Sequence, residues 1–244
     1  TSDPRVKLTN SFTLATAVTL DVEGDGDLDV VGRSGLDALR TYANDGLGGF
    51  VPTGVLSFPG EHVWYLSTGD FDGDGLDDLV VGLLDAANGQ AVRWLRNQGG
   101  TFAAPIEVRR YSAASGLLVR GLLAADVNGD GAIDIVMDRL LNGGLESGYF
   151  INPGGGFAPG ATRVVMGAGR LVDLADFTGD GLLDALMINS TWRTEFRAQD
   201  PSGSFSQVTY LPGPSPSWAR FGDGDGDGVP TTLRSGQPLD HRDQ

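Results

Sequence analysis

The chain has 244 residues, 40% of them hydrophobic, which is enough for one large globular domain. It contains no cysteine, so disulfides, zinc–thiolate sites and thiol catalysis are excluded. The formal net charge is −15 and Lys7 is the single lysine, so a basic face for nucleic acid is not expected. No apolar run approaches the ~20 residues of a membrane-spanning helix, and no membrane span is predicted.

The N-terminal segment starts at Thr1 without the pattern of a signal peptide, as expected of a processed chain. Residues 4–8 alternate apolar and charged side chains and predict a short strand. No complete repeat precedes this strand, so it is interpreted as the fourth strand of the last repeat. The N-terminus would then close the fold and remove its open sheet edges.

An Asp- and Gly-rich segment of nine residues recurs five times, starting at Asp21, Asp70, Asp126, Asp176 and Asp223. The starts lie 49, 56, 50 and 47 residues apart, and a period near 50 is typical of a four-stranded propeller blade. A Gly-rich turn follows roughly 20 residues after each of the first four segments. These turns end at Phe50, Phe102, Phe157 and Phe205. Two motifs in fixed phase indicate a genuine structural repeat.

Each repeat reads as four short strands bounded by Gly, Asn, Asp and Pro, with an aromatic residue in the third. These aromatics are Tyr42, Trp94, Tyr149 and Phe196. The predicted fold is therefore all-β, a β-propeller of five four-stranded blades closed by the N-terminal strand. The approximate blades are 12–61, 62–116, 117–169, 170–216 and 217–244 with 1–11. The alternative is a fragment of a larger propeller.

The Asp-rich segments have the chemistry of a calcium loop. Carboxylates at loop positions 1, 3, 5 and 9 and a carbonyl at position 7 offer the hard oxygen donors that Ca²⁺ prefers. Glycines at positions 4 and 6 permit the positive φ that a chain needs to wrap an ion. The predicted metal residues are Asp21, Glu23, Asp25, Asp27, Asp29, Asp70, Asp72, Asp74, Leu76, Asp78, Asp126, Asn128, Asp130, Ala132, Asp134, Asp176, Thr178, Asp180, Leu182, Asp184, Asp223, Asp225, Asp227 and Val229.

The loops differ from an EF-hand, which places an acidic ligand at position 12 and enters a helix. Here position 12 is never acidic, and a branched apolar run begins at position 10. The other alternative, metal-free Asp-Gly turns, does not explain why the five loops hold 19 of the 32 acidic residues. Up to five Ca²⁺ ions are predicted, with the second and third loops strongest. Thr178 in the fourth loop and Thr231 in the fifth replace acidic ligands and predict weaker sites.

The Asp loop followed by an apolar strand and a later Asn-Gly-Phe turn resembles the FG-GAP/VCBS repeat family. That family includes the integrin α-chain propeller, calcium-dependent fungal lectins and many secreted bacterial proteins. The resemblance implies a secreted, extracellular or cell-surface protein. It also implies that the metal loops share one face of the propeller and that ligands bind the opposite face.

The start of each predicted first strand opens on that opposite face. The candidate ligand residues there are Trp64, Tyr65, Arg120, Arg170 and Trp218. Aromatic rings stack on sugar rings and arginines bind carboxylates or hydroxyls, so the set suits an acidic or neutral glycan. The alternative is that Trp64 and Trp218 pack between blades. Trp94 and Trp192 stand in or near third strands and are interpreted as packing between blades.

Catalytic motifs are weak. The carboxylates considered were Asp173, Glu61 and Glu146, with His62 nearby and His241 near the C-terminus. No pair of carboxylates suited to glycoside hydrolysis is evident, so no catalytic residue is predicted. We therefore expect a carbohydrate-binding, lectin-like or adhesion module whose partner is a glycan or a cell-surface protein. The alternatives are a polysaccharide lyase or glycoside hydrolase, an accessory domain of one, and a structural spacer.

Overall fold

The structure is a computed structural model that describes residues 16–87, 89–141, 143–211, 219–222 and 231–234. These residues form antiparallel β-sheets and contain no α-helix. The four complete sheets comprise β1 (Ala17–Leu20), β2 (Asp29–Arg33), β3 (Ala38–Asn44) and β4 (Phe50–Ser57); β5 (Glu61–Gly69), β6 (Asp78–Asp85), β7 (Gln90–Leu95) and β8 (Ile106–Tyr111); β9 (Leu118–Ala125), β10 (Asp134–Leu141), β11 (Gly144–Phe150) and β12 (Arg163–Ala168); and β13 (Arg170–Ala175), β14 (Asp184–Ile188), β15 (Thr194–Ala198) and β16 (Gln207–Tyr210). A two-stranded sheet of β17 (Ala219–Gly222) and β18 (Thr231–Arg234) follows, and one 3-10 turn (Ala113–Ser115) precedes β9.

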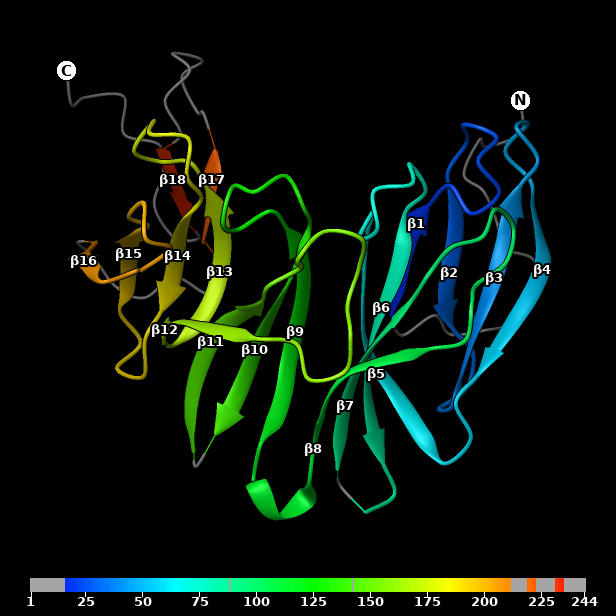
Figure 1. Cartoon of the computed structure of the whole chain (residues 1–244), viewed down its shortest axis with the longest axis horizontal. Helices are drawn as coiled ribbons and strands as arrows, with labels where there is room; N and C mark the ends of the chain where they lie inside the picture. The colour runs from blue at the N-terminus through cyan, green and yellow to red at the C-terminus, as the bar shows by residue number, and fades with distance from the viewer. Residues whose placement is uncertain (1–15, 88, 142, 212–218, 223–230, 235–244) are drawn as a thin grey trace.

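Each complete sheet is a meander in which the four strands pair in chain order. Successive sheets stand side by side, and the first strands β1, β5 and β9 contact one another in sequence (Figure 1). The predicted all-β, four-stranded repeat is confirmed, and the arrangement is like that of a β-propeller. The predicted closing strand at residues 1–11 and the fifth Asp loop lie outside the described residues, so five blades and their closure stay predictions.

The hydrophobic core is divided into layers between neighbouring sheets. Strand β6 is buried on both faces because sheets pack against it from both sides. Leu79 and Val81 join the layer shared with the first sheet, whereas Val80 joins the layer shared with the third. A further layer lies between the third and fourth sheets. The short, fully apolar second strands of the sequence are thus explained by burial on both faces.

Trp94 in β7 shows how two sheets lock together. Its ring packs edge-on against Phe157, which follows β11 of the third sheet, with ring centroids 6.3 Å apart. Gly156 makes this contact possible, because a Cβ there would lie 2.1 Å from the indole. The interpretation of Trp94 as packing between sheets is confirmed.

Candidate metal loops and ligand-binding hollow

The four described Asp loops share one conformation. Glycines at positions 4 and 6 have φ between 72° and 94° in every loop, as the wrapping geometry predicts. The position-1 carboxylate accepts hydrogen bonds from three loop amides; in the second loop Asp70 accepts from Gly73, Asp74 and Gly75 at 2.8–3.1 Å. Asp21, Asp126 and Asp176 make the same three bonds. Repeated acidic sequence therefore gives repeated backbone geometry.

The position-9 aspartates, Asp29, Asp78, Asp134 and Asp184, are fully buried. In the second loop, Asp78 accepts the amide of Phe71 at 3.2 Å and the amide of Asn97 at 2.6 Å. Corresponding bonds join Asp29 to Asn44, Asp134 to Asn152 and Asp184 to Gln199. This carboxylate therefore ties the Asp loop to the later turn. The two sequence motifs keep a fixed phase because their backbones are bonded to each other.

The second loop has the most complete donor set. Ligand atoms of Asp70, Asp72 and Asp78 all lie within 4.8 Å of one another. One oxygen of Asp72, Oδ1, is buried and has no hydrogen-bond partner among the described residues. An orphaned anionic oxygen beside two further carboxylates is suited to a hard cation. The residues of this loop therefore fit a Ca²⁺ ion.

Arg96, which directly follows β7, contacts the same loop. Its guanidinium pairs with Asp72 and with Asp74, the latter at 2.9 Å. The Asp74 pKa is held below its usual range by the Leu76 amide and by Arg96. Arg96 was not among the residues predicted at the metal loops. The sequence signal that could have identified Arg96 is its charge, because the equivalent positions of the other repeats hold the uncharged residues Ala43, Ile151 and Ala198.

The remaining loops differ in electrostatics. Burial and the neighbouring Asp29 carboxylate raise the pKa of Glu23 to about 7. Burial also raises the pKa of Asp134 to about 6. Asn128, at position 3 of the third loop, donates to Asp130 at 2.8 Å and so offers that carboxylate a neutral partner. Of the predicted fifth-loop ligands, Asp223, Asp225, Asp227 and Val229 lie outside the described residues.

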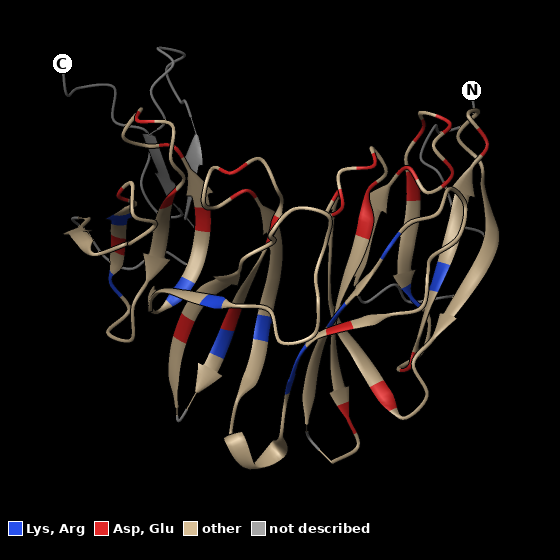
Figure 2. Cartoon of the chain, viewed as in Figure 1, with Lys and Arg blue, Asp and Glu red and all other residues tan. Residues whose placement is uncertain are grey.

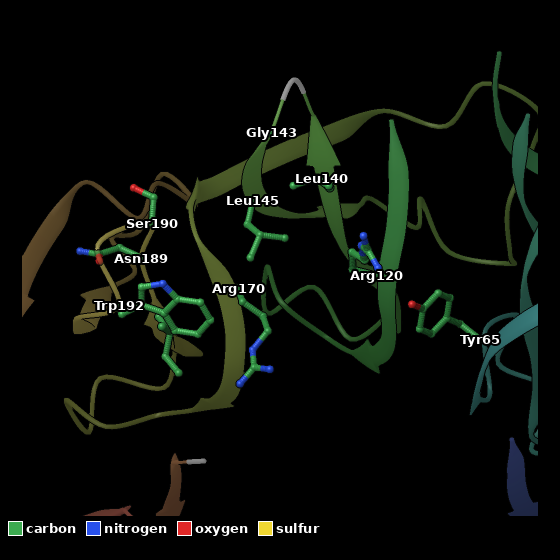
Figure 3. A pocket seen from close by; sticks show the side chains of 10 residues that line it. Tyr65, Arg120, Leu140, Gly143, Leu145, Arg170, Asn189, Ser190 and Trp192 are labelled. Carbon is green, nitrogen blue, oxygen red and sulfur yellow. The ribbon is translucent and has the colours of Figure 1, made fainter. Parts of the chain in front are cut away.

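The acidic loops gather along one edge of the structure (Figure 2). A hollow of about 570 Å³ opens toward the other ends of the strands, between the second, third and fourth sheets. We call it the inter-sheet hollow. It is lined by Tyr65, Arg120, Leu140, Gly143, Leu145, Arg170, Ile188, Asn189, Ser190 and Trp192. Trp192 and Arg170 lie on one side, and Arg120 and Tyr65 on the other (Figure 3).

The repeat itself brings these residues together. Trp64, Arg120 and Arg170 each stand six residues before the first Asp of their loop, so equivalent positions meet on one face. Trp64 and Arg120 are also the extra residues of β-bulges in β5 and β9. Bulges redirect side chains away from the regular alternation of a strand. Both side chains are accordingly exposed at the edge of their sheets.

Three of the five predicted ligand residues, Tyr65, Arg120 and Arg170, line the inter-sheet hollow. Trp64 lines an adjoining hollow of about 190 Å³ that shares Tyr65 and Arg120 with it. The ring of Trp64 is 49% exposed, so packing between blades does not bury it. The fifth predicted residue, Trp218, lies outside the described residues.

The interpretation of Trp192 as packing between blades is wrong. Its side chain is 73% exposed, and it lies in the turn between β14 and β15. Its φ is +62°, the one positive value among described residues other than glycine. Asn189 holds the turn, since its Oδ1 accepts the amides of Thr191 and Arg193, each at 3.0 Å. The misleading signal was position, because Trp192 lies in a turn of only five residues, 189–193, and so stands two residues before the third strand.

The catalytic candidates do not meet in the hollow. Glu61 pairs with Arg93 at 2.6 Å and with Arg110 at 2.9 Å. Glu146 pairs with two other arginines at 2.6–2.7 Å. Asp173 is half-buried in β13, and His62 lies in β5. Among the described residues that line the inter-sheet hollow, none is acidic or a histidine. His241 lies outside the described residues.

Comparison with known proteins agrees with the loop pattern. A family model described as an FG-GAP-like repeat matches residues 21–81 and 70–137, each match running from one Asp loop through the strand after the next. No curated protein matches the chain significantly. Within the described part of the chain, no helix has the length and apolar character needed to cross a membrane. FG-GAP repeats are typical of β-propeller adhesion or binding modules and of extracellular and surface proteins. Residues 21–137 of the chain therefore consist of FG-GAP-like repeats.

Proposed function

We propose that this protein is a secreted or cell-surface, calcium-stabilised propeller that binds carbohydrate in the inter-sheet hollow. The observation that carries the proposal is Trp192, an exposed indole in a strained turn at the rim of a hollow that also contains Tyr65. Positive φ costs roughly 1 kcal/mol or more for a residue with a side chain. A large aromatic kept in that conformation and in solvent contributes little to folding, and its ring suits the apolar face of a sugar.

Calcium has a structural role in this proposal. Asp70, Asp72 and Asp78 would hold the ion in the second loop, and the first, third and fourth loops would bind in the same manner. A bound cation would supply the positive charge that offsets the crowded carboxylates. Binding to the folded chain alone would stabilise it by mass action.

A glycan array with the calcium-loaded chain tests the function, with Trp192→Gly as the decisive variant. Glycine adopts positive φ without strain, so this variant should fold at least as stably as the parent. Selective binding that disappears in the glycine variant supports the proposal. Selective binding that survives the substitution places the site elsewhere and refutes the role of the hollow. A blank array refutes the carbohydrate ligand and favours a protein partner, as in adhesion.

A further inference from the structure

The inter-sheet hollow is lined by two arginines, Arg120 and Arg170, that form no ion pair with a carboxylate among the described residues. Six other arginines pair with carboxylates: Arg93, Arg96, Arg110, Arg139, Arg163 and Arg197. By contrast, no hydrogen bond or ion pair joins the side chain of Arg120 or Arg170 to another described residue. Both side chains are exposed. On a chain with net charge −15, two guanidiniums that have no ion-pair partner among the described residues form a local positive site in one hollow.

Asp138 interacts with Arg170 electrostatically, without an ion pair between the two side chains. Asp138 lies close enough for Arg170 to affect its pKa, but burial dominates and raises that pKa to about 6. Its carboxylate is already bonded to the Ser147 hydroxyl at 2.5 Å and to the Leu171 amide at 3.2 Å. The side chain of Arg170 is exposed and lies on the side of the hollow, where a ligand can reach it (Figure 3).

We propose that the inter-sheet hollow binds an anionic saccharide, a uronic acid residue whose carboxylate engages Arg120 and Arg170 while its ring stacks on Trp192. This assignment rests on the proposed carbohydrate function and names its ligand class. Guanidinium groups bind planar carboxylates through paired hydrogen bonds, which a neutral sugar hydroxyl cannot match. A volume of about 570 Å³ accommodates one or two sugar rings with the walls that the lining provides.

The two aromatic residues and the two arginines of the hollow have separate tasks. Trp192 and Tyr65 supply aromatic surface at the two sides of the hollow, which binds any sugar with an apolar face. Arg120 and Arg170 discriminate between acidic and neutral sugars, because a neutral ligand has no anionic group to bond with the two guanidiniums. Two charge-assisted contacts at roughly tenfold each give about a hundredfold preference for the acid.

Titration calorimetry of the full chain in excess calcium tests the assignment. The probes are a trimer of galacturonic acid, the matched trimer of galactose and a sulfated galactose trimer. The variants are Arg120→Gln, Arg170→Gln and Trp192→Gly. Arg193→Gln is the matched control, because it removes one charge from the same turn while its guanidinium lies over the Tyr210 ring, 4.7 Å from the centroid. Melting curves confirm that each variant is folded.

The expected result is that uronate binds about a hundredfold tighter than the neutral trimer, and that either arginine substitution weakens uronate binding about tenfold while the control changes it little. Equal binding of acid and neutral trimers, lost only in Trp192→Gly, overturns the anionic assignment but leaves the carbohydrate function. Preference for the sulfated trimer over the uronate overturns the carboxylate assignment. No binding of any trimer removes both this inference and the proposed function.

Discussion

Asn152 offers the sharpest test of how neighbouring sheets are held together. Its side chain amide donates to the carbonyl of Phe71 in the second loop at 2.7 Å and to the carbonyl of Ile133 at 2.9 Å. Its Oδ1 accepts the amide of Gly154 at 3.1 Å. The residue is fully buried. One side chain thus joins the Asp loop of the preceding sheet, its own loop and its own turn.

The informative change is Asn152→Gln, because the fourth sheet already has glutamine at this position. Gln199 is buried, yet neither of its side chain amide atoms has a partner among the described residues. Asn152→Gln should therefore lose three hydrogen bonds. At about 1 kcal/mol each, the free energy of unfolding should fall by about 3 kcal/mol.

Urea unfolding followed by tryptophan fluorescence, in saturating calcium, measures this loss. The control is Asn44→Gln, since among the described residues the Asn44 side chain bonds only to Leu28 and Gly46 of its own repeat, each at 3.2 Å. The control should lose about 1 kcal/mol, because its groups remain open to water. A loss below about 0.5 kcal/mol in Asn152→Gln would refute the reasoning, because the bond between sheets would then contribute no measurable stability.

Three further predictions follow from single contacts. Gln199→Asn should raise the free energy of unfolding by about 1 kcal/mol. This gain is smaller than the loss expected in Asn152→Gln, because Pro201 has no amide to donate to the new Oδ1; an unchanged urea midpoint would contradict the prediction. Asp138→Asn should stabilise the protein by up to about 3 kcal/mol at pH 8, from a pKa of about 6 against 3.8. The sign follows because the raised pKa of Asp138 makes the folded parent lose stability as pH rises from about 4 to 6. The difference in unfolding free energy between the variant and the parent should therefore be large at pH 8 and close to zero at pH 4; a difference that does not depend on pH would argue against the prediction. Arg96→Gln should lower the melting temperature in chelator and tighten calcium binding several-fold in calorimetry, because no guanidinium then competes for Asp72 and Asp74; unchanged calcium affinity would show that Arg96 does not compete.

The repeat could be predicted from sequence because its signals are local and periodic. Asp21, Asp70, Asp126 and Asp176 each cap amides within five residues, so spacing alone carries the information. The aromatic residues of the third strands follow the same period. The structure places them in β3, β7, β11 and β15 as expected.

The missed residues depend on contacts between distant segments. Gln199 occupies the Asn position of the fourth repeat. In the sequence, the following Asp200 resembles the start of the turn motif, because its carboxylate holds a turn of its own by accepting the Ser202 amide at 2.9 Å. Trp192 was misassigned because nothing local distinguishes an exposed indole from one packed between sheets. Its exposure depends on the hollow that three sheets form together.

The first strand of each sheet separates the two proposed sites. In the third sheet, β9 begins beside Arg120 and leads directly into the loop that starts at Asp126. Six residues of extended chain span about 20 Å, which is more than twice the screening length of about 8 Å at physiological ionic strength. Charge at the loops therefore has little direct effect on an anion in the hollow. Calcium and ligand would influence each other through the packing of sheets, which Trp94, Asn97 and Asn152 maintain on the loop side.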